Sequence, residues 1–353
     1  MSGLSVVTPY GRAGASARVR VYDWLEHLAA PHRLCNYLGA RNASPQTLLA
    51  RIPDVVRAER SLRALDLSRD VLLLQREASP LSRGHLEQSL LRRALRSVYD
   101  FDDALQWDSV PGLRSAFPKP LKTERCVRAA DLVVAGNDLL ADWASRFSRE
   151  VHVVPSCIEP DQYPVKTDYA LTGQPVLGWV GSPTTEPHLK LVENPLLEMH
   201  RRTGARLVVV SAGAAPLGAL EPMVTRVEWN PVTVGRVMTS FDVAIAPLIE
   251  TLFARGKCAY KILQYAACSL PVVGSPVGAN REVLGRLGLA AVSHPSEWLD
   301  QLEALLAGSA DARRALGERA RLGVVQHYSY AAWASVMSRL LGVPTDARLR
   351  SWA

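Results

Sequence analysis

The sequence predicts an α/β protein with two doubly wound parallel sheets in tandem. Short apolar segments of strand length alternate with helical patterns along the whole chain, which is the order typical of parallel sheets. Both halves also open in the same way, with a strand followed by a loop of small residues, at 4–14 and at 176–185. With 353 residues and a mass of 38.6 kDa, the chain is long enough for two domains.

The first half is expected to contain five strands. They cover Leu4–Thr8, Asp70–Leu74, the segment that ends at Asp100–Asp103, Asp131–Ala135 and Val151–Pro155. The helical patterns between them include Val21, Leu25 and Leu28, then Pro45–Leu65, Leu86–Arg96 and a helix from Leu139 capped by the tripeptide Gly136–Asp138.

A polar segment at 166–175 is the expected linker to the second half. The strands that follow are expected at Val176–Val180, Leu207–Ser211, Arg226–Trp229, Val243–Pro247 and Pro271–Gly274. The helical run Ser309–Leu341 ends the chain, and its aromatic residues are placed to return to the first half. We therefore expect domains at 1–168 and 169–325, with a returning C-terminal segment at 326–353.

Composition narrows the class of protein. Hydrophobic residues make up 48% and charged residues 21% of the chain, as in a well-cored globule. No apolar run approaches the roughly 18 residues that span a bilayer, and the start lacks a leader pattern, so we expect a cytoplasmic protein without stable membrane insertion. The five cysteines lack metal-ligand spacing and are expected to be reduced. The net charge of +7 is shared by both halves and aromatics are 7%, so nucleic-acid binding is not expected.

Two lysines, Lys257 and Lys261, stand four residues apart at the start of a short helical pattern that precedes a buried strand and a glycine-rich loop. Cations at a helix start oppose the helix dipole unless an anion lies between them. The pair therefore suggests a phosphate-rich ligand, while a solvated basic turn is the alternative.

Acidic residues gather at the end of another strand. Asp100, Asp102 and Asp103 follow Val98, and Gln75 comes directly after the preceding strand, at its carboxyl end. Close carboxylates can bind a divalent cation. No further acidic or histidine ligand is evident, so we instead expect Asp102 and Asp103 to bind hydroxyl or amino groups of a ligand, without metal. Capping of a following helix is the third interpretation.

The assembled pattern resembles the GT-B glycosyltransferases, in particular the family-four (group 1) retaining enzymes, from about Leu4 to about Leu341. FDVAIAPL followed by GKCAYKILQYAACSLPVVGSPVGANREV resembles the donor-site signature of one branch. AADLVVAGNDLLADWA, HVVPSCIEPDQY and the WVGS loop add support, and YDFDDAL resembles a motif on the acceptor side of the cleft in that branch.

The resemblance implies that a nucleotide diphosphate sugar binds the second half, with UDP-GlcNAc or UDP-glucose favoured, as co-substrate rather than cofactor. It places the base near Trp229 and Asn230, and the diphosphate against Gly181, Ser182, Lys257 and Lys261. From the first half, the loop with Gly11, Gly14, Ser16 and Arg18 would close on the diphosphate. Lys257, Lys261, Asp102 and Asp103 are thus the expected catalytic residues, and Asp100, Asp102, Asp103 and Gln75 the expected acceptor-binding ones.

Two departures from the family pattern bear on this assignment. Many members carry two glutamates eight residues apart, and this chain has Gly256 and Gln264 there. Gln264 can still accept from the ribose, but the sugar contact must come from elsewhere. Many members also have a basic residue where this chain has Ser182, so the two lysines would supply the charge on the diphosphate.

The acceptor is open at this point. An aminocyclitol or another secondary-metabolite scaffold would suit the aspartates, and a lipid-linked or cell-surface saccharide would suit the basic helix face from Arg57 to Arg63. A nucleotide-sugar hydrolase or epimerase would need a general base. A noncatalytic nucleotide-sugar binding subunit is the last alternative, because the two glutamates are absent.

Overall fold

The computed structural model describes residues 3–39, 45–108 and 115–344, and its contacts divide the chain into two compact units. Unit 1 comprises residues 1–157, 255–258 and 330–353, and unit 2 comprises residues 158–254 and 259–329. The expected linker at 166–175 begins within unit 2, where the Lys166 amide donates to Cys268 O over 3.0 Å. Residues 345–353 of the expected C-terminal segment lie outside the described residues.

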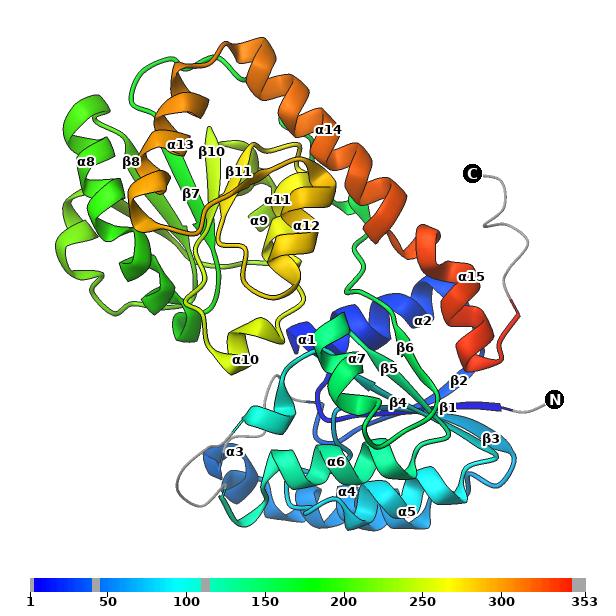
Figure 1. Ribbon diagram of the computed structural model, residues 1–353. Helices are drawn as coiled ribbons and strands as arrows, with labels where there is room; N and C mark the ends of the chain where they lie inside the picture. The colour runs from blue at the N-terminus through cyan, green and yellow to red at the C-terminus, as the bar shows by residue number, and fades with distance from the viewer. Residues whose placement is uncertain (1–2, 40–44, 109–114, 345–353) are drawn as a thin grey trace. The chain divides into compact units, whose positions relative to one another are not determined.

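Unit 1 is built on a six-stranded parallel sheet (Figure 1), in which the strands lie in the order β2-β1-β3-β4-β5-β6. Their bounds are β1 Gly3–Thr8, β2 His32–Asn36, β3 Asp70–Gln75, β4 Arg96–Phe101, β5 Leu132–Ala135 and β6 Val151–Val153. The chain winds outward in both directions from the boundary between β1 and β3. In sheets of this kind ligands bind at the carboxyl ends of the strands beside that boundary.

Helices cover both faces of the unit 1 sheet. One face carries α2 (Asp23–Leu28) and α15 (Tyr330–Leu341), where Trp24 and Tyr330 pack edge to face at 4.9 Å. Before α2 come α1 (Ala15–Ala17) and a π-helical turn, η1 (Arg18–Tyr22). The other helices are α3 (Pro45–Ala50), α4 (Ile52–Ala64), α5 (His85–Arg93), η2 (Leu105–Trp107), α6 (Lys119–Ala129) and α7 (Asp138–Ala144). α7 is capped by Asn137, one of the three residues Gly136–Asp138 expected to cap it, because the Asn137 side chain accepts from the Leu140 amide.

Unit 2 also has a six-stranded parallel sheet, in the order β12-β11-β10-β7-β8-β9. Its strands are β7 Val176–Val180, β8 Arg206–Val210, β9 Val224–Val227, β10 Val243–Ala246, β11 Val272–Gly274 and β12 Ala290–Ala291. This is the Rossmann order, and its winding reverses between β7 and β10. The loop after β7 therefore starts at the place in the sheet where a nucleotide is expected.

The unit 2 sheet is also covered on both faces. One apolar cluster joins the sheet to α9, α11, α12 and α14, and a second joins it to α8 and α13. The helices are η4 (Pro160–Gln162), η5 (Pro183–Val192), α8 (Glu193–Thr203), η6 (Gly218–Met223), α9 (Val234–Thr239), α10 (Leu252–Arg255), α11 (Tyr260–Ala267), α12 (Ala279–Leu287), α13 (Pro295–Ala307) and α14 (Ala310–Tyr328).

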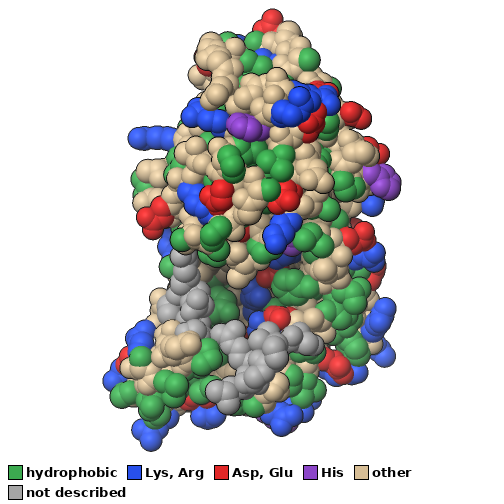
Figure 2. All heavy atoms as spheres, turned by 90° about the vertical axis from the view of Figure 1, so that its left-hand side faces the viewer, with side chains coloured by type: hydrophobic (Ala, Val, Ile, Leu, Met, Phe, Trp, Pro, Cys, Tyr) green, Lys and Arg blue, Asp and Glu red, His purple; other side chains and the backbone are tan. Residues whose placement is uncertain are grey.

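The predicted α/β fold with two doubly wound parallel sheets is confirmed. Two strands were not predicted, β2 and β12. On the face drawn in Figure 2, Lys and Arg side chains are scattered among acidic and apolar ones and do not form one basic patch. In the described part of the chain, no helix combines the length and the apolar character needed to cross a membrane.

Candidate functional site

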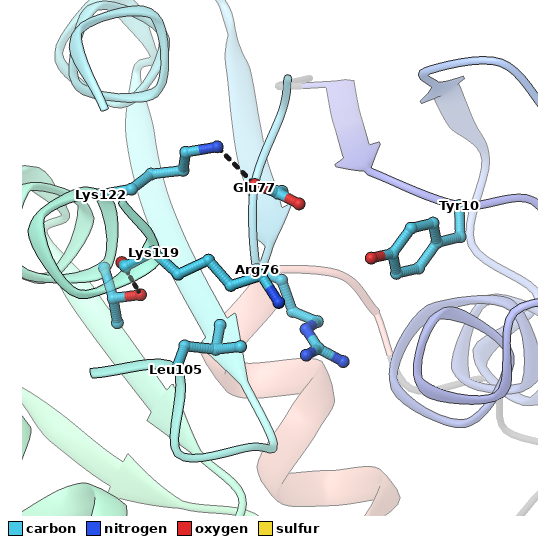
Figure 3. Close-up of a pocket in the computed structure, with 7 residues that line it drawn as sticks. Tyr10, Arg76, Glu77, Leu105, Lys119 and Lys122 are labelled. Atoms are coloured by element: carbon cyan, nitrogen blue, oxygen red, sulfur yellow. Dashed lines mark hydrogen bonds and ion pairs between the residues drawn. The ribbon is translucent and has the colours of Figure 1, made fainter. Parts of the chain in front are cut away.

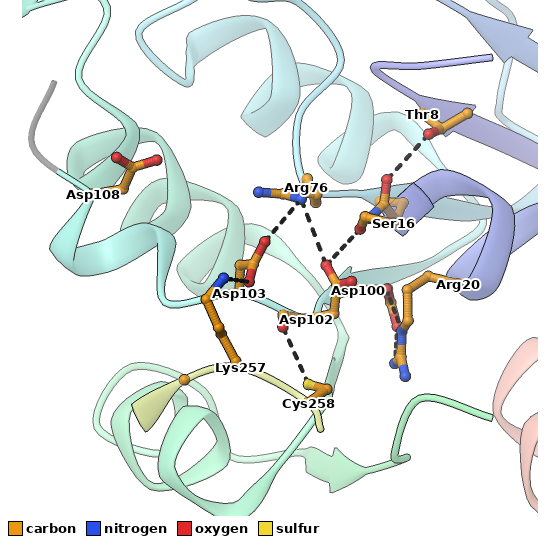
Figure 4. A network of polar contacts seen from close by, with 12 residues as sticks. Thr8, Ser16, Arg20, Arg76, Asp100, Asp102, Asp103, Asp108, Lys257 and Cys258 are labelled. Atoms are coloured by element: carbon orange, nitrogen blue, oxygen red, sulfur yellow. Dashed lines mark hydrogen bonds and ion pairs between the residues drawn. The ribbon is translucent and has the colours of Figure 1, made fainter. Parts of the chain in front are cut away.

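A chain of hydrogen bonds links three strand ends at the winding reversal of unit 1 (Figure 4). Thr8 Oγ1 donates to Gln75 Oε1 over 3.1 Å, and Gln75 Nε2 donates to Ser16 Oγ over 2.8 Å. Ser16 Oγ in turn donates to Asp102 Oδ1 over 2.6 Å. Gln75 is fully buried, so it acts as a fixed support for Ser16 and, through it, for Asp102.

Arg76 lies between the two aspartates that follow β4. Its Nη1 is 3.2 Å from Asp103 Oδ2 and 3.8 Å from Asp102 Oδ1. Burial lowers the pKa of Arg76, but the carboxylates of Asp103 and Asp102 outweigh burial and hold that pKa above its usual value. The backbone of Arg76 has a φ of 61°, which is rare for a residue with a side chain. Such strain often occurs at functional sites, where the surrounding structure maintains it.

Asp103 is the second carboxylate of this cluster. Its Oδ1 lies 4.0 Å from Lys257 Nζ, so Arg76 and Lys257 contact opposite oxygens of one carboxyl group. Burial raises the pKa of Asp103, and the charge of Asp102 adds to the increase, while Arg76 and Lys257 oppose it.

Asp100 forms a buried ion pair with Arg20. Neither side chain is exposed, and Arg20 Nε donates to Asp100 Oδ1 over 3.1 Å while its Nη2 bonds the other oxygen. Arg20 Nη1 also donates to Val154 O and Pro155 O, at 2.7 and 3.0 Å. The expectation that Asp100 contacts an acceptor is therefore not favoured, because Arg20 already occupies both of its oxygens inside the fold.

The segment 255–258 precedes α11 and packs within unit 1. Asn137 Nδ2 donates to Gly256 O over 2.9 Å, and Cys258 Sγ donates to Asp102 O over 3.1 Å. A Cβ atom at Gly256 would lie 2.5 Å from the Ala104 Cβ atom. The position where many family members carry a glutamate therefore has no room here for any side chain.

In unit 2, Lys261 and Gly181 lie together at the winding reversal. Lys261 Nζ stands 4.2 Å from the ring centroid of Trp179, a cation–π contact, and 3.3 Å from Thr185 Oγ1. A Cβ atom at Gly181 would lie 2.2 Å from Trp179 Cη2 and 2.7 Å from Lys261 Nζ. Ser182 follows as the N-cap of η5. This gives a glycine loop, a helix start and an ammonium group in one place, a combination suited to phosphate.

The other predicted donor residues of unit 2 have local roles. Trp229 and Asn230 follow β9, and Asn230 Oδ1 accepts from the Val232 amide over 2.8 Å, which fixes that turn. Gln264 is buried on α11, where its Nε2 donates to the hydroxyl of Tyr163 over 3.1 Å. Their expected contacts with base and ribose remain predictions.

The predicted residues thus fall into two groups. Ser16, Gln75, Asp102, Asp103 and Lys257 come together in unit 1, and Gly181, Ser182 and Lys261 come together in unit 2. The two lysines predicted to share one diphosphate belong to different units, and Lys257 contacts Asp103.

The predicted loop at Gly11 and Gly14 is a tight turn directly before α1. The Gly14 amide donates to Gly11 O over 2.9 Å, and a Cβ atom at Gly11 would lie 2.5 Å from Gly39 O. Arg18 is half-buried in η1, while Arg20, two residues further on, is enclosed by the fold. Contact of this loop with a diphosphate remains a prediction.

Sequence reasoning missed a cavity beside Arg76 in unit 1 (Figure 3). It lies at the carboxyl end of β3, and its lining is Tyr10, Arg76, Glu77, Leu105, Lys119, Lys122 and Thr123. The polar residues directly after β3 were the available signal, because side chains at strand ends face the ligand edge of a parallel sheet. Among the described residues, no group of three or more His, Cys, Asp or Glu side chains is placed to hold a metal ion.

One family model matches part of the chain. Residues 174–308 match the model of the family described as glycosyl transferases group 1. That segment contains the loop after β7, α11 and β11. No curated protein sequence matches the chain.

Solved structures match the whole chain at low sequence identity. Anabaena Alr3699/HepE in complex with UDP and glucose has a TM-score of 0.66 at 13% identity, covering 97% of this chain and 100% of that one. A glycosyltransferase from Rickettsia africae has a TM-score of 0.65 at 12% sequence identity, with 100% of both chains covered. WaaG, a glycosyltransferase involved in lipopolysaccharide biosynthesis, has a TM-score of 0.63 at 13% sequence identity, covering 96% of this chain and 98% of that one.

Two parallel sheets of this kind, matched over nearly the full length by known glycosyltransferases, define the GT-B fold. The resemblance to the group 1 glycosyltransferases is confirmed by the family match over residues 174–308. Together the family match and the fold support a glycosyltransferase of the GT-B type.

Proposed function

We propose that this protein is a retaining glycosyltransferase that moves a sugar from a UDP-sugar to a hydroxyl group of a small polar acceptor. The observation that carries the proposal is the position of Lys261, which lies on Trp179 beside Gly181 where the unit 2 sheet reverses its winding. This arrangement falls inside the segment that matches group 1 glycosyltransferases. UDP is favoured over GDP because Anabaena HepE, which has the same fold, was solved with UDP and glucose.

In this proposal the diphosphate lies against Gly181, Ser182 and Lys261. An ammonium group 4 Å from a phosphate oxygen is worth on the order of 4 kcal/mol at an effective dielectric near 20. Negative charge on the leaving diphosphate grows in the transition state, so part of this energy lowers the barrier. The departing phosphate takes the proton of the acceptor hydroxyl, and the lysine charge makes a metal ion dispensable.

The acceptor hydroxyl would bind in unit 1 near Asp102 and Asp103. Asp103 already has two cationic partners, Arg76 at 3.2 Å and Lys257 at 4.0 Å. A positively charged amino group on the acceptor substrate would therefore compete with Arg76 and Lys257 for the Asp103 carboxylate. A neutral hydroxyl needs only one acceptor oxygen, and this favours a polyhydroxy compound over an aminocyclitol.

A lipid-linked acceptor is the second candidate, and the observation that favours it is on α3 and α4. Leu49 is 70% and Ile52 55% exposed, and the Arg57 and Arg63 side chains of α4 are 75% and 64% exposed. Exposed apolar residues beside arginines suit an anionic membrane surface. Flotation with vesicles containing an anionic lipid tests this directly, and protein that stays at the bottom of the gradient excludes this candidate.

The first experiment is calorimetric titration of UDP and GDP, with EDTA present, on the wild type, Lys261→Ala and Lys190→Ala. Lys190 is an exposed lysine of η5 in the same unit and serves as the matched control. We expect UDP to bind the wild type and Lys190→Ala, and Lys261→Ala to lose at least tenfold in affinity. Binding only after a divalent cation is added would contradict metal independence. If UDP binds but no sugar is released or transferred from any UDP-sugar, the noncatalytic alternative gains support.

The retaining outcome needs a separate measurement. Proton NMR of the product formed from an α-linked UDP-sugar reports the anomeric configuration through its coupling constant. An α-linked product is expected. A β-linked product would show inversion and would require a general base.

A further inference from the structure

The cavity next to Arg76 carries an excess of positive charge on its wall. Three lining residues are basic, Arg76, Lys119 and Lys122, while Glu77 is acidic. Figure 3 shows the side chains of Lys119 and Arg76 directed into the same space, with the Tyr10 ring facing them from the opposite side. The carboxylates that neutralise Lys119 and Arg76 belong to residues outside the lining.

Lys122 has a structural role in this wall. Its side chain is 2% exposed, and its ammonium group bonds both the Glu77 carboxylate and Ser79 O. Burial lowers the pKa of Lys122, but Glu77 and Glu87 outweigh burial and raise that pKa above its usual value. Lys122 and Glu77 therefore form a fixed pair. The basic groups of the cavity that remain to bind a ligand anion are those of Lys119 and Arg76.

Lys119 is the more accessible of these two. It is the first residue of α6, its side chain is 27% exposed, and its Nζ lies 2.5 Å from Asp108 Oδ2. An exposed or half-exposed ion pair of this kind contributes little to stability, about 0–1 kcal/mol. Lys119 can therefore exchange Asp108 for another anion at small cost.

Arg76 connects the cavity to the aspartates of the candidate acceptor site. Its guanidinium lines the cavity and also reaches Asp103 and Asp102, at 3.2 and 3.8 Å. An anion held by Lys119 and Arg76 would therefore lie next to the carboxylates expected to receive the acceptor hydroxyl. Arginine suits this role because its planar donors match phosphate and carboxylate oxygens.

We propose that this cavity binds an acidic group of the acceptor, a phosphate monoester or a carboxylate, through Lys119 and Arg76. The inference rests on the proposed glycosyltransferase function and names the class of acceptor: a hydroxylated compound that carries an acidic group. Tyr10 closes the cavity from the loop after β1, and Leu105 gives it one apolar wall.

The test is titration of the full chain with glucose 6-phosphate, glucuronate and glucose, in which saturation-transfer NMR measures the binding. Three variants are compared, Lys119→Gln, Asp108→Asn and the control Lys190→Gln. We expect both acidic sugars to bind at least tenfold more tightly than glucose. Lys119→Gln should bind these acidic sugars about tenfold more weakly than the wild type. Asp108→Asn removes the competing carboxylate and should leave binding equal or tighter. Lys190→Gln should change nothing.

The two acidic sugars distinguish the sources of the acidic group. Tighter binding of glucose 6-phosphate indicates a phosphorylated acceptor, and equal or tighter binding of glucuronate indicates a carboxylate. Equal binding of all three sugars, or unchanged binding in a folded Lys119→Gln variant, would overturn the proposal. UDP titration of the same samples keeps the two proposals apart, because its binding depends on Lys261 in unit 2 and not on Lys119.

Discussion

Asp102 accepts from Ser16 of α1 over 2.6 Å and lies 3.8 Å from Arg76, directly after β3, so its charge is held by a helix start and by a neighbouring strand end. Asp102→Asn keeps an oxygen for Ser16 and removes the charge. Because a hydrogen bond to a charged group is worth about 1.5–3 kcal/mol, we expect kcat/KM for the acceptor to fall roughly 10- to 100-fold. Steady-state kinetics with saturating UDP-sugar measures this. Asp161→Asn, at an exposed carboxylate of unit 2, is the control, and equal kinetics of the two variants would exclude a role for Asp102.

Gly181 has no space for a side chain, because Trp179 and Lys261 lie against its Cα atom. Gly181→Ala should destabilise unit 2 by about 1–3 kcal/mol, as overpacking usually does, and should weaken UDP binding. Gly285→Ala is the matched control. A Cβ atom there meets nothing within 4 Å inside α12, so helix propensity should stabilise the protein by up to about 1 kcal/mol. Urea unfolding of both variants checks this, and two changes of the same sign would contradict it.

Single residues of the site could be predicted where neighbouring residues in the sequence were enough to identify their position at a strand end. Ser16, Asp102 and Lys261 stand in loops and helix starts that follow apolar strands, and the structure places them at the ligand edges of the two sheets. Asp100 could not be assigned, because its partner Arg20 is 80 residues away in the chain. Alternation along β4 indicates on which side a carboxylate lies, but it does not indicate what covers that side.

At the scale of elements, the Arg20–Asp100 pair joins η1, β4 and the end of β6. Burial lowers the pKa of Arg20, but the Asp100 carboxylate outweighs burial and raises that pKa above its usual value. Arg20→Met leaves a buried carboxylate without its partner, so we expect a loss of about 3–5 kcal/mol in the free energy of unfolding. The double variant Arg20→Met, Asp100→Leu removes both charges and should recover most of this loss.

Urea unfolding of the wild type, the single variant and the double variant forms the test. Recovery in the double variant would show that the uncompensated charge causes the loss. A double variant as unstable as the single one would instead mean that the hydrogen bonds to Val154 O and Pro155 O hold the three elements together.

Elements with strong apolar runs were predicted, and those without them were missed. β3 is buried at five of its six residues, whereas β2 has an exposed or half-exposed residue at every position. β2 is an edge strand and needs no apolar run, because backbone pairing with β1 is enough to place it. β12 has only two residues, too few for a periodic signal.

At the scale of the whole molecule, the tandem repeat of two sheets could be predicted because each half contains its own alternation of strands and helices. The limits of the units could not. Residues 255–258 belong to unit 1, although they lie within the sequence of the second half. The contacts responsible, from Asn137 to Gly256 and from Cys258 to Asp102, join positions more than 100 residues apart.

Thiols withdrawn from water in both units predict a loss of stability in alkali: Cys157 and Cys268 are buried, and Cys258 is half-buried. Burial raises the pKa of Cys157, Cys258 and Cys268 to about 12. In the unfolded chain a thiol titrates at about 8.5, so above that pH the unfolded chain releases protons that the folded protein keeps. The stabilising contribution of each thiol is therefore complete below about pH 8.5 and is lost as the pH rises toward 12, at about 1.4 kcal/mol per pH unit for each thiol.

For these three thiols, the free energy of unfolding summed over both units should fall by about 3–4 kcal/mol between pH 9 and pH 10. Urea unfolding at half-unit steps from pH 7.5 to 10 measures the slope. Cys268→Ala serves as the internal control. Removing one thiol should reduce the slope by the contribution of one proton, about 1.4 kcal/mol per pH unit, even if the variant is less stable throughout. A free energy of unfolding that stays constant up to pH 10 would mean that these thiols ionise as readily in the folded protein as in the unfolded chain, and hence that water reaches them.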